Sequence, residues 1–156
     1  MKKICLVTTS LEKSEIDGKN IYLGNWCKSE DYIITNETVV PYHWDDREKL
    51  EKDSIYINKL YERILTELSK LLNSAHKKNY TKEYWRSVIG YWLFLFLSSI
   101  FDKWESISNA FRFFDGINYT KTFKPFNKQH PLIPKTLKEY NSISSHTEWN
   151  HLICSE

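Results

Sequence analysis

The sequence predicts an α/β fold in which a short sheet at the amino terminus is packed by two long helices. Residues 4–7 form a continuous apolar run rich in strand formers, which suits a strand covered on both faces. Two long segments, 45–77 and 81–110, carry apolar residues at helical spacing. With 156 residues, the chain is long enough for a single domain over 1–156 with one hydrophobic core.

Two further short strands are expected after the first one. Residues 21–24 follow the turn signal Asp17-Gly18, and residues 38–40 end at Pro41. We expect a parallel sheet, although the connectors are only marginally long enough for helical crossovers. The order of the strands and the pairing of all three therefore stay open.

Both long helices have a recognisable start. Asp45 is placed to cap the first helix, and Glu48 three residues later completes a capping box. This helix is expected to end at about Lys77. Thr81 is placed to cap the second helix, which is expected to run to about Ala110.

The centre of the second helix, residues 88–101, is apolar almost all round. A membrane span is the rival interpretation, but the apolar run is shorter than the ~20 residues that a bilayer crossing needs. Burial inside the protein is therefore favoured, and no transmembrane segment is predicted. Contact with a protein partner or a membrane surface remains an alternative, because a small domain cannot always cover such a helix.

The carboxyl-terminal part has a weaker pattern. Residues 111–146 are expected to be rich in loops, because Asp115-Gly116 is a turn signal and prolines recur at 125, 131 and 134. A helical pattern then starts at Thr147, and the sequence ends at Glu156 after barely two turns. A helix this short is marginal unless it is packed. We therefore expect the chain to be a truncated part of a longer protein.

Charge and cysteine content narrow the classes of function. The 22 Lys and Arg residues and 20 Asp and Glu residues give a net charge of +2 with mixed signs, which does not favour nucleic-acid binding. The three cysteines are widely spaced, without a CxxC pair, as is typical of reduced thiols in a cytoplasmic protein. The first apolar run is too short for a signal peptide.

No cofactor or metal site is predicted. His146 and His151 are five residues apart, which is not the i, i+4 spacing that places two ligands on one helical face. The glycines form neither a dinucleotide-binding pattern nor a phosphate-binding loop.

Polar side chains follow each of the three predicted strands. Thr9 and Ser10 follow the first strand, Asn25 and Trp26 the second, and the segment 42–47 the third. Ligands of open α/β sheets bind beyond the carboxyl ends of the strands. If the strands are parallel, the three loops therefore converge on one crevice.

The segment 42–47 is the densest chemical cluster in the chain. His43 could act as a general base or bind a phosphate, and Asp45 or Asp46 could orient it or accept a proton. Arg47 could neutralise a phosphate. The structural alternatives are that Asp45 only caps the helix and that Arg47 is only a solvated residue of its first turn.

Arg86 lies near the start of the second helix, beside two aromatic residues. It could reach an anionic ligand with help from the helix amino terminus. A structural or cation–π role is the equal alternative.

Taken together, these motifs resemble the amino-terminal region of a family of transferases found in bacterial O-antigen and surface-polysaccharide gene clusters. The resemblance is carried by residues 6–13, 22–27, 40–50, 84–86 and 148–151, with further matches at 89–90, 92–93 and 155–156. The run Tyr-His-Trp-Asp-Asp-Arg at 42–47 is its most specific part.

The resemblance implies one lobe of a longer, two-lobed enzyme of the glycosyltransferase kind. Such an enzyme acts on a nucleotide-activated sugar or a lipid-linked acceptor. Its donor site lies mainly on the carboxyl-terminal lobe, so we expect the fragment alone to be inactive. The competing interpretation is a non-catalytic binding or assembly module that docks another chain through the aromatic helix 84–101.

The resemblance also implies roles for the polar residues named above. His43 is expected to transfer a proton or contact a phosphate, Arg47 and Arg86 to bind phosphate, and Trp26 or Trp44 to stack on a sugar. The residues expected to line the cleft are Thr9, Ser10, Asn25, Trp26, His43, Trp44, Asp45, Asp46, Arg47 and Arg86.

Overall fold

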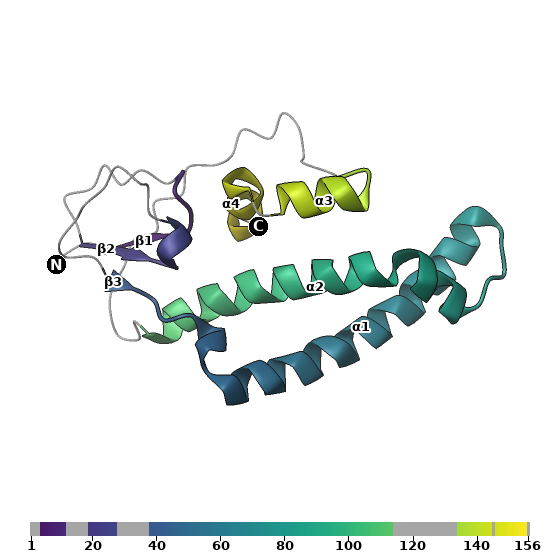
Figure 1. Ribbon diagram of the computed structural model, residues 1–156, viewed down its shortest axis with the longest axis horizontal. Coiled ribbons are helices and arrows are strands. Elements are labelled where there is room, and N and C mark those ends of the chain that lie inside the picture. The colour runs from purple at the N-terminus through teal and green to yellow at the C-terminus, as the bar shows by residue number, and fades with distance from the viewer. Residues whose placement is uncertain (1–3, 12–18, 28–37, 114–133, 145, 156) are drawn as a thin grey trace. The chain divides into compact units, whose positions relative to one another are not determined.

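The computed structural model describes residues 4–11, 19–27, 38–113, 134–144 and 146–155 (Figure 1). The predicted turns at Asp17-Gly18 and Asp115-Gly116, and the prolines at 125 and 131, lie outside these residues. The chain divides into two compact units. We call Met1–His43 with Lys103–Glu156 the sheet unit, and Trp44–Asp102 the helical unit.

The sheet unit contains three parallel strands, β1 (Ile4–Val7), β2 (Lys19–Tyr22) and β3 (Thr38–Val39), in the order β1-β2-β3. The expected short parallel sheet is thereby confirmed, with the strand order now settled. Strand β2 begins earlier than the apolar run 21–24 because backbone pairing also includes the polar Lys19 and Asn20. Pairing continues past the strand ends, since Leu23 N donates to Val7 O at 2.9 Å.

An apolar cluster holds this unit together. Ala110 and Ile107, in the last turns of helix α2 (Lys82–Phe113), pack against residues of the strands and of the loops that follow them. The buried members of the cluster are Leu6, Val7, Ile21, Tyr22, Leu23, Cys27, Val40 and Ala110. The end of a long helix therefore covers the sheet.

Helix α1 (Arg47–His76) begins one residue later than a cap at Asp45 requires. Asp46 is the N-cap, and its carboxylate accepts from the backbone N–H of Glu48 at 2.9 Å and of Lys49 at 3.2 Å. The prediction that Asp45 caps this helix was therefore wrong. Asp45 closes the short 3₁₀ turn η2 (His43–Asp45), one position too early to serve the first turn of α1.

The end of α1 and the start of α2 agree with the prediction, whereas the end of α2 does not. Helix α1 ends at the expected place, where Lys77 takes a left-handed conformation with φ 53°. Thr81 caps α2, since its Oγ1 accepts from Tyr84 N at 3.2 Å. Helix α2 runs on to Phe113 instead of ending at Ala110. No helix in the described part of the chain combines the length and the apolar character that a bilayer crossing requires.

In the helical unit, α1 packs along α2 (Figure 1). Leu65 of α1 and Trp85 and Leu93 of α2 are buried at the centre of this contact. Half-buried neighbours extend the contact along both helices: Tyr61, Ile64, Leu68, Leu72, Ile89, Trp92 and Leu97. One face of the aromatic helix, α2, is therefore buried against α1.

Two short helices complete the sheet unit. Helix α3 (Leu137–Ile143) lies within the segment expected to be rich in loops and was not predicted. It is capped by Thr136, whose Oγ1 accepts from Glu139 N at 3.1 Å. Helix α4 (Thr147–Ser155) begins where the sequence predicted. Trp149 meets Tyr140 edge to face at 6.0 Å, and both rings are buried, so the short helix is packed.

Candidate functional site at the carboxyl edge of the sheet

The loops that leave the three strands are joined to one another. Because the strands are parallel, their carboxyl ends lie at the same edge of the sheet. The Cys27 thiol, in the second loop, donates to the backbone oxygen of Thr8 in the first loop at 3.1 Å. Trp26 of the second loop meets Tyr42 of the third edge to face, with ring centres 6.1 Å apart. We call the residues 8–10, 24–27 and 40–43 the sheet edge.

A buried hydrogen bond ties the sheet edge to the last helix. Oγ1 of Thr9 lies 3.0 Å from Nδ1 of His151 in α4, and both residues are buried. Buried polar groups are costly unless they are hydrogen-bonded, so this bond fixes the Thr9 hydroxyl in place. The sequence pattern did not predict the contact between Thr9 and His151, because the two residues are 142 positions apart.

His43 occupies the third loop of the sheet edge. Its ring is buried, with only 4% of its surface exposed, and is tilted against the Tyr42 ring at 4.8 Å. The loop is held by Asn109 of α2, whose side-chain amide donates to Pro41 O at 2.9 Å. A buried imidazole therefore stands in the third loop, next to the tyrosine that contacts Trp26 of the second loop.

The exposed side of the sheet edge is marked by Trp26. It lies in the short 3₁₀ turn η1 (Asn25–Cys27), and 43% of its surface is exposed. Gly24 allows this placement, because a Cβ at that position would overlap the Trp26 ring. The Lys103 ammonium of α2 lies over the ring, 5.1 Å from its centre. Sequence reasoning missed Lys103, which has no motif of its own.

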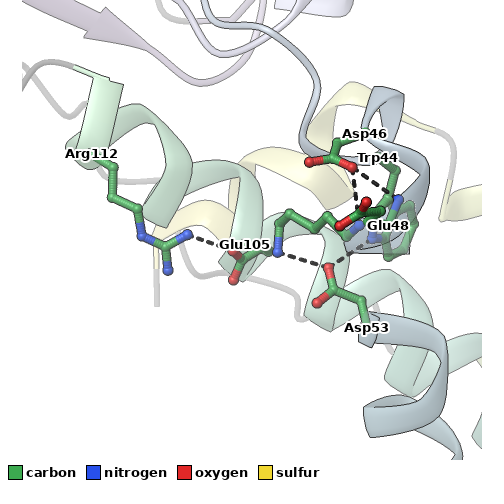
Figure 2. A network of polar contacts seen from close by, with 7 residues as sticks. Trp44, Asp46, Glu48, Asp53, Glu105 and Arg112 are labelled. Carbon is green, nitrogen blue, oxygen red and sulfur yellow. Dashed lines mark hydrogen bonds and ion pairs between the residues drawn. The ribbon is translucent and has the colours of Figure 1, made fainter. Parts of the chain in front are cut away.

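Helix α2 also contributes an ion pair, between Glu105 and Arg112, to the sheet unit. The Glu105 carboxylate is buried and pairs at 2.8 Å with Arg112, whose side chain is exposed (Figure 2). These residues are seven apart, so they share one face of the helix. The guanidinium offsets the cost of burying the carboxylate.

Trp44 and its neighbours lie in the helical unit. The Trp44 indole N–H donates to Asp53 at 3.0 Å, and Lys49 pairs with the same carboxylate oxygen at 2.9 Å (Figure 2). The Trp44 ring is stacked on Phe101 of α2, with centres 6.5 Å apart. A solvent-open hollow of about 920 Å³ runs along this helix start and is lined by Trp44, Asp45, Arg47, Leu50, Glu51, Ser54 and Ile55.

Arg86 is engaged in an ion pair between the two long helices. Its guanidinium lies 2.9 Å from Glu62 of α1, and Lys82 reaches the same oxygen at 2.7 Å. The hydrogen bond from Lys82 lowers the pKa of Glu62 below its ordinary value. Burial opposes this change in pKa, and the hydrogen bond and charge of Arg86 add to it. A contact between Arg86 and an anionic ligand stays a prediction.

The structure thus sorts the predicted site residues into two groups. Thr9, Ser10, Asn25, Trp26 and His43 belong to the sheet unit. The helical unit contains Trp44, Asp45, Asp46, Arg47 and Arg86. Within the described ranges, no three His, Cys, Asp or Glu side chains are grouped so as to hold a metal ion.

The structure therefore defines an α/β protein with a short parallel sheet and long helices. A comparison with protein families matches residues 4–156 to the family described as LIC12162 family transferase. The chain belongs to this family of transferases, which confirms the predicted transferase class. No curated protein and no solved structure matches it.

Proposed function

We propose that the chain is the amino-terminal α/β part of a sugar transferase that builds O-antigen or another surface polysaccharide in the bacterial cytoplasm. Membership of a transferase family supports group transfer. The run at 42–47 supports a role in surface-polysaccharide synthesis, because it carries the resemblance to transferases of such gene clusters. The thiols of Cys27 and Cys154 are buried and not joined in disulfides, which fits a reducing compartment.

One observation carries this proposal: the three loops of the sheet edge are bonded together around polar and aromatic side chains. The Cys27 to Thr8 bond and the Trp26 to Tyr42 contact place these groups side by side. The hydroxyl of Ser10 and the amide of Asn25 suit the hydroxyls of a sugar, whereas the buried Thr9 hydroxyl holds His151 in place. An indole suits the apolar face of a sugar ring.

We assign the chemical roles as follows. His43 accepts the proton of the attacking hydroxyl or contacts a phosphate, since an imidazole exchanges protons near neutral pH. Trp26 is the stacking residue, because it stands at the sheet edge with 43% of its surface exposed. A role of Asp45 and Asp46 in orienting reacting groups or accepting a proton stays a prediction from the sequence.

Phosphate binding is the role of the arginines. Arg47 of the first turn of α1 is exposed and lines the solvent-open hollow. Its guanidinium contacts the phosphate of a nucleotide sugar or a lipid-linked acceptor. Arg86 pairs with Glu62, about 22 Å farther along α1, so an anionic ligand of Arg86 would be a separate one. The partners are therefore small or lipid-linked phosphates and a carboxyl-terminal lobe, and not nucleic acid.

Sugar binding is tested by saturation-transfer NMR with glucose, galactose, N-acetylglucosamine and their UDP derivatives. We expect saturation to reach the sugar-ring protons. Trp26→Ala should remove this transfer, whereas Trp104→Ala, which also alters an exposed tryptophan of the sheet unit, should leave it unchanged. A lack of sugar-ring signals with every compound would contradict the proposal.

The proton-transfer role is tested by turnover in a full-length family member that carries the same motif. His43→Ala should lower the transfer rate about 100-fold or more, as expected for loss of a general base. Arg47→Ala should remove most turnover by weakening phosphate binding. Circular dichroism should show that both variants fold. Wild-type turnover in both would reject the assignment.

A second candidate function, docking of another chain through the aromatic helix, is favoured by one exposed stripe. Tyr84, Val88 and Tyr91 are 44%, 58% and 64% exposed, at the i, i+4 and i+7 positions of one face of α2. Light scattering separates the two functions. A self-associated species that Tyr91→Glu converts to a monomer would support docking, and a monodisperse wild-type monomer would argue against self-association through this stripe.

A further inference from the structure

The turn that joins α1 to α2 has a well-fixed shape (Figure 1). We call residues 73–81 the hairpin tip. The Asn73 amide donates to Tyr80 O at 2.8 Å, and its oxygen accepts from Tyr80 N at 3.0 Å and from the Trp85 indole at 2.9 Å. The left-handed Lys77 closes α1, since its backbone N–H bonds back to Ser74 O. One asparagine therefore holds both the turn and the start of α2.

Two exposed tyrosines stand on this turn. The rings of Tyr80 and Tyr84 lie 4.1 Å apart between centres, and both are exposed. The buried Trp85 ring meets each of them edge to face, at 5.9 Å and 5.3 Å. A tyrosine joins an apolar ring to a polar hydroxyl, so it suits a boundary between water and an apolar phase. The tip therefore presents an ordered amphipathic surface.

The charge around the tip is all of one sign. Residues 68–82 contain four lysines and no acidic residue, whereas the whole chain has a net charge of only +2. Lys70 and Lys82 are each paired with a glutamate of α1. The exposed Lys77 and Lys78 form no ion pair with any residue that the structure describes. Two unpaired ammonium groups thus stand beside the two exposed tyrosines.

This combination fits an anionic lipid surface better than a protein partner. Protein interfaces are depleted of lysine and enriched in arginine, and residues 68–82 contain no arginine. Near a bilayer, ammonium groups are attracted by anionic headgroups, and the long lysine side chain reaches toward them. Tyrosine side chains are enriched at the level of the headgroups. Both kinds of exposed side chain at the tip therefore match the same partner.

We propose that the hairpin tip docks the chain on the surface of a bilayer that contains anionic lipids. Lys77 and Lys78 contact lipid phosphates, and Tyr80 and Tyr84 enter the headgroup layer. The inference goes beyond the proposed function, because it names a partner of the helical unit and does not depend on which group is transferred.

The test is flotation of the full chain with lipid vesicles. One kind of vesicle is pure phosphatidylcholine, and the other contains phosphatidylcholine and phosphatidylglycerol in equal amounts. We expect the chain to float with the anionic vesicles and not with the neutral ones. Added salt should weaken this binding, because it screens exposed charges. Equal binding to both kinds, or binding to neither, would overturn the proposal.

The discriminating variant is the double change Lys77→Gln with Lys78→Gln. It should lower partition to the anionic vesicles about 25-fold, since each lysine near such a surface contributes roughly fivefold. Lys52→Gln with Lys59→Gln removes the same charge from α1 at about 27 Å or more from Lys77, and should change partition little. Equal losses in both double variants would show attraction by net charge and overturn the role of the tip. Arginine at both tip positions should retain binding.

The role of the tyrosines is tested separately. Tyr84→Ser should lower partition to the anionic vesicles about fivefold, because it removes apolar area from the contact. Tyr56→Ser, at an exposed tyrosine of α1, is the matched control and should leave partition unchanged. An unchanged partition in Tyr84→Ser would overturn entry into the headgroup layer. A chain that self-associates but binds neither kind of vesicle would replace the bilayer with a second copy of the chain.

Discussion

The two units of the chain place their polar groups differently. In the helical unit the ion pairs lie on or near the surface, and the buried hydroxyl of Ser69 is satisfied within its own helix by Leu65 O at 2.6 Å. The sheet unit instead buries Thr8, Thr9, His43, Glu105, Ser106 and His151. Burying polar groups lowers stability unless they are paired, so proteins tend to keep them where function needs them. The contrast favours the sheet unit as the place of ligand binding.

The helical unit should depend on apolar packing above all. Leu65 is fully buried between the two long helices. Leu65→Ala should lower the free energy of unfolding by about 2–5 kcal/mol, because it leaves a cavity. Leu71→Ala, at a leucine of the same helix that is 66% exposed, should change it by less than about 0.5 kcal/mol. Urea denaturation measures both, and equal losses would contradict the packing described here.

The sheet unit should instead depend on a polar contact. Thr9→Val keeps the shape of the side chain but removes the partner of His151 Nδ1, which should cost about 1–3 kcal/mol of unfolding free energy. Thr9→Ser keeps the hydroxyl and should lose less. In a His151→Phe background the same Thr9→Val change should cost less than in the wild type. Additive losses in thermal or urea unfolding would show that the two side chains do not interact.

The boundary of α1 can be tested at two neighbouring carboxylates. Asp46→Ala should lower the free energy of unfolding by about 1 kcal/mol, because it removes the acceptor of two backbone N–H groups. Asp45→Ala should have little effect, since Asp45 is exposed and precedes the cap. Urea denaturation of both variants measures the difference. A larger loss of unfolding free energy in Asp45→Ala than in Asp46→Ala would show that Asp45, as the sequence predicted, is the cap.

The smallest effect is expected from the surface ion pairs of Glu62. Lys82 and Arg86 lower its pKa below the ordinary value of 4.5, so the carboxylate holds fewer protons in the folded state than in the unfolded state. The resulting stability is present above pH 4.5 and is lost as the pH falls through the lowered pKa. Glu62→Gln should remove this part of the pH dependence in unfolding experiments. High salt should weaken it, because the group is exposed to solvent.

The sequence was most informative where structure is local. The spacing of apolar residues predicted both long helices, and Thr81 and Lys77 marked their boundaries, because caps and periodicity depend on residues a few positions apart. Helix α3 carried a comparable signal that went unused, since Thr136 and Glu139 have the spacing of a capping box. The prediction of Asp45 as the cap failed because the next residue, Asp46, also carries a carboxylate that can accept from the first turn.

The candidate site was only partly predictable. Polar residues after each strand could be named from the sequence, since a strand end is a local feature. Neither the bond from Thr9 to His151 nor the contact of Lys103 with Trp26 follows from any spacing. The sequence by itself determined the two long helices, the strand segments and the residues that follow them. The tertiary structure alone decided the parallel strand order and the partners across the sheet edge, because such contacts join residues whose separation along the chain carries no periodic signal.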